Sequence, residues 1–160
     1  MRWPPASLFD EPATLRARMD SHTLDSHHLE PNLTPDDAGA NLRAIKEAFR
    51  VFTDTGVTSG VEALLRISHQ DCRFSPPSAE GRVLEGHEEV RAYFREALAA
   101  GTSVTVRPRI FEEHGDEVVV SGSTRVMRPG GSFAERQVRW IYRFRDGLVE
   151  EAGWRPRHCA

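Results

Sequence analysis

The polar side chains with the strongest potential to act on a small molecule lie in the last third of the chain. From residue 136 to 145 the side chains of a predicted strand alternate between two faces, and one face carries Arg136 and Tyr142 among apolar residues. If that face points inward, a guanidinium and a phenol can bind an anionic or carbonyl oxygen there. We favour the alternative, in which Arg136 is solvated at the rim and Tyr142 is a core aromatic residue with one satisfied hydroxyl.

Glu150 is the third residue considered for catalysis. On the next predicted strand it shares parity with Ala152 and Trp154, so one choice of register makes it a cavity carboxylate. Its place beside the Asp146-Gly turn instead favours an exposed side chain. We therefore assign no catalytic residue and keep Arg136, Tyr142 and Glu150 as candidates.

The histidines and cysteines form no metal or redox motif. His69 follows one predicted helix and His87 opens another, positions that favour shaping a turn or capping a helix over acting on a ligand. Cys72 and Cys159 lack metal-ligand and redox spacing and are interpreted as thiols. The histidines between residues 22 and 28 lie in a segment with no predicted structure. We expect no metal, and the absence of a phosphate loop or dinucleotide fingerprint predicts no cofactor.

The overall composition excludes two classes of partner. The chain of 160 residues has 21 basic and 24 acidic side chains, so it has no overall positive field for binding nucleic acid. No run approaches the roughly 18 apolar residues of a membrane helix, and the N-terminus has no apolar signal region. We expect a cytoplasmic protein that meets neither nucleic acid nor membrane.

Order is predicted to begin at Thr34. Residues 1–33 contain four prolines and no sustained period, which is typical of a flexible leader. Thr34-Pro-Asp-Asp then supplies an N-cap, a proline at the first helical position and acids in the first turn. The spacing of Leu42, Ile45, Phe49 and Phe52 gives one apolar stripe on a helix that Gly56 ends.

Two further helices and a sheet are expected after Gly56. A helix from Ser59 or Gly60 to Ser68 precedes a short strand at 72–74, and another begins at Gly86 or His87 and ends at Gly101, burying positions up to Leu98. Segments rich in Val, Ile and aromatic residues, separated by glycine turns, then predict an antiparallel meander. The strands are expected at 104–113, 117–127, 137–145 and 148–155. Helices followed by strands indicate an α+β fold.

Three stretches carry a family resemblance: residues 64–77 (LLRISHQDCRFSPP), 86–94 (GHEEVRAYF) and 142–149 (YRFRDGLV). They resemble SnoaL-like proteins of the nuclear transport factor two (NTF2-like) superfamily. The resemblance implies a cone-shaped fold of three helices packed on a curved antiparallel sheet, spanning residues 34–157 and leaving 158–160 as a tail. It also implies a conical pocket. Members include cyclases, isomerases, dehydratases, epoxide hydrolases and proteins without demonstrated activity, so the fold alone does not select a chemistry.

The resemblance also locates the proton-handling residues of the isomerase-type members. Those members use a tyrosine in the first helix, a carboxylate base at the end of the first strand and a protonated aspartic acid on the sheet. The matching positions here hold Phe49, then Ser75 or Pro76, and Trp140. We therefore expect no isomerase chemistry of that type.

Three functions are kept open, in order of preference. The first is binding of a small apolar or aromatic molecule in the pocket. The second is a cofactor-free cyclase, hydratase or hydrolase, and the third is a dimerisation domain whose cone is filled by its own side chains. The residues expected to contact a ligand are Phe49, Phe74, Val138, Trp140, Tyr142 and Trp154.

The outward face of the 137–145 strand is predicted to be basic. Arg139, Arg143 and Arg145 share it. SnoaL-like proteins commonly dimerise through this face, which predicts a homodimer in which the arginines meet acidic residues of a twofold mate. The acidic residues considered are Glu112, Glu113 and Glu117. The alternative is a solvated face without a partner.

Overall fold

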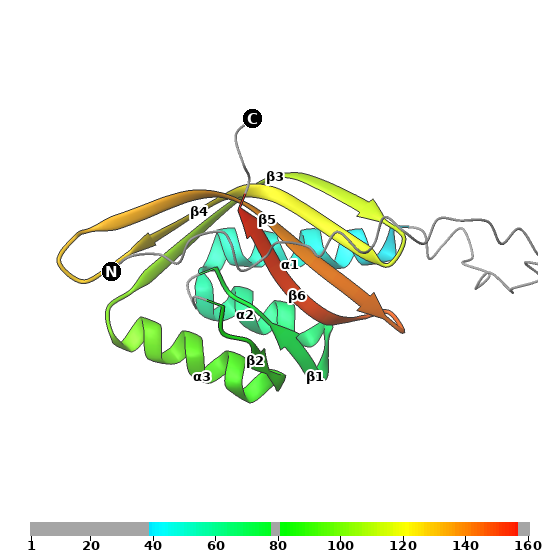
Figure 1. Cartoon of the computed structure of the whole chain (residues 1–160), viewed down its shortest axis with the longest axis horizontal. Helices are drawn as coiled ribbons and strands as arrows, with labels where there is room; N and C mark the ends of the chain where they lie inside the picture. The colour runs from blue at the N-terminus through cyan, green and yellow to red at the C-terminus, as the bar shows by residue number, and fades with distance from the viewer. Residues whose placement is uncertain (1–38, 78–80, 157–160) are drawn as a thin grey trace, which may run out of the picture.

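The domain is a curved sheet with three helices against its concave side (Figure 1). The computed structural model describes residues 39–77 and 81–156. The predicted α+β architecture is confirmed. In chain order the elements are α1 (Ala40–Thr55), α2 (Val57–Arg66), β1 (Ser68–Phe74), β2 (Leu84–Glu85), α3 (Gly86–Ala99), β3 (Ser103–His114), β4 (Glu117–Met127), β5 (Phe133–Arg145) and β6 (Leu148–Pro156).

The six strands lie in the order β2-β1-β6-β5-β4-β3. The predicted meander is confirmed, since β3 to β6 pair antiparallel with their chain neighbours. β1, however, pairs parallel to β6, and the two-residue strand β2 was not predicted. No hairpin joins β1 to β6, so hairpin geometry does not fix their relative direction.

The first helix presents the predicted apolar stripe to the sheet. Ile45 and Phe49 are buried, and Leu42 and Phe52 are half-buried. Gly56 ends the helix as expected, with φ of 94° and its N–H donating to the Phe52 carbonyl over 3.1 Å. The proposed cap at Thr34, the leader at 1–33, the histidines at 22–28, Cys159 and the 158–160 tail lie outside the described residues.

The predicted boundary between the second helix and the first strand was wrong. α2 begins directly after Gly56 and ends at Arg66, and β1 begins at Ser68, four residues before the expected strand. The Ser68 hydroxyl donates to the Leu64 carbonyl over 2.7 Å, which satisfies an acceptor of the last helical turn as the chain becomes extended. The longer β1 therefore runs beside β6 from its first residue.

The last turn of α3 departs from the expected burial. Val90 is fully buried and Phe94 half-buried, as the spacing predicts, but Leu98 is 38% exposed. The residues around Leu98 are also mostly exposed, so this end of the helix lies beyond the core. No helix in the described ranges is long and apolar enough to cross a membrane.

The alternating faces of β5 are confirmed. Val138, Trp140, Tyr142 and Phe144 are each at most 7% exposed, whereas the arginines between them are exposed. Antiparallel pairing with β4 and β6 places the first set over the helices. This face of β5 forms one wall of the core.

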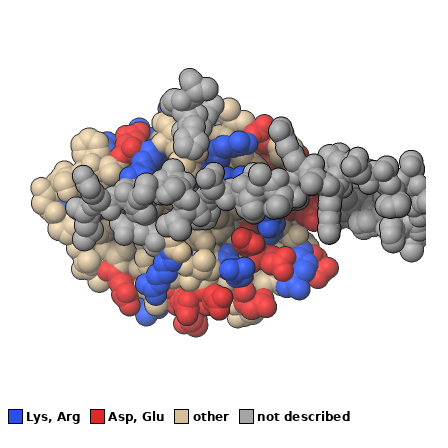
Figure 2. All heavy atoms as spheres, viewed as in Figure 1, with Lys and Arg blue, Asp and Glu red and all other residues tan. Residues whose placement is uncertain are grey.

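The arginines of the outer face pair with acidic residues of the same chain. Arg139 of β5 lies 3.9 Å from Glu112 of β3, two strands away, and Arg143 of β5 lies 3.5 Å from Glu117 of the neighbouring β4. Two of the glutamates considered for a twofold mate therefore have partners within the chain, and Figure 2 shows both charge signs interspersed on the visible face. Exposed pairs of this kind contribute little stability. The homodimer stays a prediction.

One half-buried ion pair joins α2 to α3. Arg91 donates to both oxygens of Glu62, over 2.7 and 3.2 Å. The hydrogen bond from Arg91 lowers the pKa of the Glu62 carboxyl, outweighing the effect of burial. The pKa of this carboxyl is therefore lower in the folded protein than in the unfolded chain. The ion pair stabilises the fold at pH values above the pKa of the unfolded chain, and this stabilisation is lost as the pH falls through the pKa of the folded protein.

We therefore expect Glu62→Gln to lower the free energy of unfolding at neutral pH by up to about 1 kcal/mol. Urea unfolding measures this, and the difference from wild type is expected to shrink as the pH falls below the ordinary value of 4.5. Glu88→Gln is the control, because Glu88 meets the same arginine but its side chain is 85% exposed. A loss for Glu62→Gln that is unchanged in acid contradicts this explanation.

Candidate functional site

A cavity lies between the helices and the concave face of the sheet. Its volume is about 70 Å³, measured as the space open to the centre of a water-sized sphere. By that measure one water needs roughly 10–15 Å³, so the space holds several waters or a small ring. The lining residues are Ala48, Phe49, Phe52, Gly60, Val61, Leu64, Phe74, Ser75, Pro76, Pro77, Val90, Phe94, Val104, Val106, Thr124, Val126, Trp140, Tyr142, Ala152 and Gly153.

Phe49 of α1 stands at the centre of the aromatic wall. Its ring centroid lies 5.2 Å from that of Trp140, 5.8 Å from Phe111 and 6.1 Å from Tyr142. The contacts with Phe111 and Tyr142 are edge-to-face, an arrangement that the ring quadrupoles favour. Helix and sheet thus hold each other in one arrangement around the cavity.

The close approach of α1 to α2 sets the helical side of the cavity. A Cβ at Gly60 would lie within 2.2 Å of the Phe52 ring. Only glycine lets the two helices pack this tightly, and Phe52 and Gly60 both line the cavity. Because residue 60 has no side chain, α2 can lie close to α1 and form this wall of the cavity with it.

The polar side-chain groups of the lining are neutral. Ser75, Thr124 and Tyr142 supply hydroxyls and Trp140 carries an indole N–H, and the described lining contains no carboxylate, imidazole, ammonium or guanidinium group. Burial raises the pKa of the Tyr142 hydroxyl, so this phenol stays protonated at neutral pH. The cavity is an apolar space with a few neutral hydrogen-bonding groups.

Four of the six predicted ligand contacts meet in this cavity. Phe49, Phe74, Trp140 and Tyr142 line it, from α1, β1 and β5. Val138 is fully buried in the adjoining core, and Trp154 packs against the same core, but neither belongs to the lining. These four aromatic residues lie in the cavity wall, and their contact with a ligand stays a prediction.

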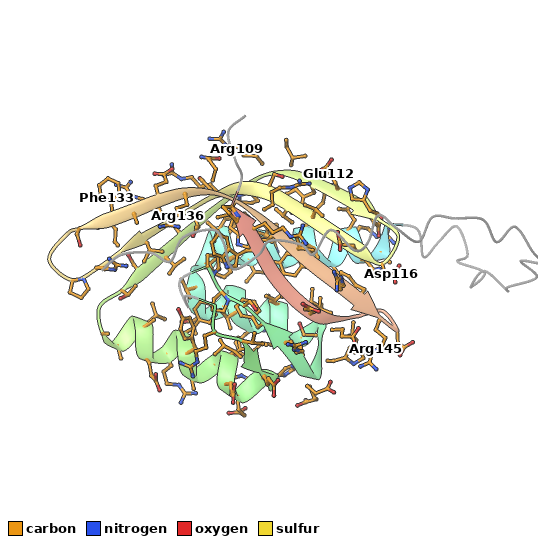
Figure 3. The ribbon with its side chains drawn as sticks, viewed as in Figure 1. Arg109, Glu112, Asp116, Phe133, Arg136 and Arg145 are labelled. Atoms are coloured by element: carbon orange, nitrogen blue, oxygen red, sulfur yellow. The ribbon has the colours of Figure 1, made fainter. Side chains whose placement is uncertain are left out.

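Two of the three catalytic candidates lie outside the cavity. Arg136 is on the inward face, paired with Thr124 and close to the Phe133 end of β5, but it is not a lining residue (Figure 3). Glu150 is exposed and forms an ion pair of 3.2 Å with Arg145. Tyr142 is the candidate that remains.

A β-bulge explains the position of Glu150. The register between β5 and β6 changes between the pairs Arg143↔Glu151 and Phe144↔Val149. This leaves Glu150 as an extra residue on β6. Buried Val149 and Ala152 are consequently three residues apart instead of two. The parity argument for an inward Glu150 fails at this bulge, and the exposed side chain that we favoured is the one observed.

Sequence reasoning missed the walls contributed by β3, β4 and α3. Val104, Val106, Thr124 and Val126 line the cavity from the two strands, and Phe94 lines it from α3. Residues 118 to 124 of β4 are all buried and their apolar residues do not alternate, so the sequence carried no signal for the inward face of this strand. The pairing with β5, which sets Val120 opposite Trp140 and Thr124 opposite Arg136, is what places Thr124 on the cavity side.

The two candidate histidines lie at a separate, more open groove. The His69 Nε2 is 2.7 Å from the Arg145 carbonyl oxygen, and the His87 Nε2 is 3.3 Å from that of Ser68. Both rings therefore hold backbone segments together, in agreement with a structural role. Among residues 39–77 and 81–156, no cluster of three or more His, Cys, Asp or Glu side chains is suited to a metal ion.

A family model for the SnoaL-like domain matches residues 43–152. This range includes every residue that lines the cavity except Gly153. Comparison with curated proteins finds no match.

Solved structures with the same fold are numerous, and three illustrate its range. An NTF2-like protein from Burkholderia pseudomallei is 22% identical with a TM-score of 0.62, covering 74% of this chain and 91% of its own. TerC, co-crystallised with polyporic acid, is 24% identical with a TM-score of 0.61, covering 74% and 92%. SalBIII, an epoxide hydrolase/cyclase-like enzyme in pyran ring formation in salinomycin, is 16% identical with a TM-score of 0.57, covering 74% and 91%.

Proposed function

Because the chain belongs to the SnoaL-like domain family, we propose that its cavity binds a small apolar or aromatic molecule. The observation that carries this proposal is the lining itself, which combines aromatic and aliphatic walls with hydroxyls and no charged group from the described residues. Concave, mostly apolar spaces with a few polar groups are the usual form of small-molecule sites. TerC, which has the same fold, was co-crystallised with a small molecule, polyporic acid, and this supports binding of a small molecule.

The lining also favours binding over isomerase chemistry. The positions that match the isomerase tyrosine, base and acid hold Phe49, Ser75 or Pro76, and Trp140, and all of them line the cavity. A phenylalanine, a proline and an indole do not exchange protons at neutral pH, and a serine without an adjacent histidine is a poor base. Enolisation by a carboxylate base is therefore not part of the proposed function.

A cofactor-free cyclase or hydrolase is the second candidate. SalBIII supports it as a structural neighbour, and so does a putative polyketide cyclase from Xanthomonas campestris, which is 11% identical with a TM-score of 0.56. Tyr142 is the lining residue that suits such a role, as a protonated hydroxyl that can donate to a substrate oxygen. The third candidate, a cone filled by its own side chains, is disfavoured because the cavity is open to water-sized molecules.

Filling the cavity tests the binding proposal. Ala48 lines the cavity from α1 and is 6% exposed, so Ala48→Leu places three extra carbons in or against it. We expect binding of a one-ring aromatic probe such as acetophenone to fall at least about tenfold while the protein stays folded. NMR titration of the lining methyl groups measures the affinity, and circular dichroism checks the fold.

Ala44→Leu is the matched control. Ala44 lies one turn earlier on α1 and is half-buried, but it is not a lining residue. Its substitution should leave the affinity unchanged. Equal affinities for wild type and Ala48→Leu would place the binding site elsewhere.

A further inference from the structure

The hydroxyls of the cavity lack protein partners. No hydrogen bond to the Tyr142, Thr124 or Ser75 hydroxyl is found among the described residues. In that part of the chain, the one polar side-chain atom that is fully shielded from water and unpaired is Arg125 Nε. The three hydroxyls are therefore within reach of water-sized molecules, and the cavity is the space that they line.

Two of the residues that carry these hydroxyls have backbones beside the same lining residue. Tyr142 pairs with Ala152 across β5 and β6. The Ser75 N–H donates to the carbonyl of the same Ala152 over 2.8 Å. Tyr142 and Ser75 are thus both direct neighbours of one lining alanine, whereas Thr124 lies six residues along β4 from Val118, the partner of Tyr142.

The surroundings of these hydroxyls favour a ligand with a neutral hydrogen-bond-accepting oxygen and disfavour an anionic ligand. A buried phenol favours a ligand group that accepts its proton in a hydrogen bond, since an apolar ligand would displace water from the hydroxyl and leave it unpaired. An anion entering the same space would lose its hydration, and the described lining offers no cation in return. Burial raises the pKa of Tyr142, which agrees with an environment that disfavours negative charge.

We propose that the cavity selects an uncharged aromatic ligand with a hydrogen-bond-accepting oxygen, such as a ketone, that receives the proton of the Tyr142 hydroxyl. This inference rests on the proposed binding function and adds the chemical class of the ligand. Tyr142 is then the residue that sets specificity, and the apolar walls supply affinity without discriminating between ketone and hydrocarbon.

Three probes of nearly equal shape separate these contributions. Acetophenone has a neutral acceptor oxygen, cumene replaces its carbonyl oxygen with a methyl group, and benzoate carries a negative charge. For the wild-type protein we expect acetophenone to bind about fivefold to tenfold more tightly than cumene. Benzoate is expected to bind at least about tenfold more weakly than acetophenone. Dissociation constants come from NMR titration of the lining methyl groups.

Tyr142→Phe removes the hydroxyl and keeps the ring. The affinity for acetophenone should fall to that for cumene, while the affinity for cumene stays unchanged or rises slightly. Tyr93→Phe is the control, since Tyr93 packs against Phe94 on α3 but does not line the cavity. It should keep the preference for the ketone.

The outcomes distinguish this inference from the binding function beneath it. Equal affinities of wild type for acetophenone and cumene, or tightest binding of benzoate, would overturn the inference and leave the binding function intact. A ketone preference that survives in Tyr142→Phe would also overturn it. If none of the three probes binds, the proposed function itself fails.

Discussion

Replacing Gly122 with alanine is expected to destabilise the domain by about 3 kcal/mol. Gly122 lies in the middle of β4, opposite Pro108, where the register between β3 and β4 shifts. A Cβ at this position would lie 2.2 Å from the Arg107 carbonyl oxygen and 2.9 Å from the Pro108 Cα. Both are backbone atoms, so no side-chain rotation relieves the overlap, and the bulge itself has to move.

Gly153→Ala is the matched control for this substitution. Gly153 also lies in a strand, and a Cβ there meets no atom within 4 Å. Its replacement should change the free energy of unfolding by no more than about 0.5 kcal/mol. Urea unfolding of both variants measures the difference. Equal stabilities would mean that the β3–β4 bulge is not packed as described.

The second large effect is expected for Phe49→Ala. Phe49 is 7% exposed, and its ring contacts those of Trp140, Phe111 and Tyr142. Removing a buried phenylalanine typically costs about 3–5 kcal/mol, because apolar surface and packing contacts are lost and a void remains. The loss should fall at the lower end, since Phe49 already borders an empty space.

Phe133→Ala gives the comparison. Phe133 is 57% exposed on the outer side of β5, where its ring lies under the Arg125 guanidinium. An exposed cation–π contact contributes roughly 0.5–1 kcal/mol, so this variant should lose no more than that. A loss for Phe49→Ala as small as that for Phe133→Ala would contradict the central place of Phe49 in the core.

The sequence was most informative where apolar residues repeat at one regular spacing without interruption. The period of two on β5 placed Trp140 and Tyr142 inside, and the helical spacing of Ile45 and Phe49 gave the stripe that packs against them. Both patterns report burial directly, because a helix or strand with one buried face repeats its apolar residues at a fixed interval. The family resemblance supplied the arrangement of these elements, and the fold confirms it.

The sequence was least informative where the period is broken or where distant strands pair. The bulge at Glu150 inserts one residue, which reverses the parity of everything before it on β6. The parallel pairing of β1 with β6 has no local signal at all. The cavity walls from β3 and α3 depend on how the helices pack against the sheet, which the local sequence does not show. Val106 and Phe94 were therefore not recognised as lining residues.

We propose that a neutral one-ring ligand enters the cavity between the helices and the concave face of the sheet. The most direct measurement is an isotope-filtered NMR experiment on the methyl-labelled protein with acetophenone, which detects protons of the ligand and protein that lie close together. We predict contacts to the methyl groups of Val61, Val90 and Val106, which line the cavity. Contacts confined to Ile110, which is 49% exposed and does not line the cavity, would contradict the claim.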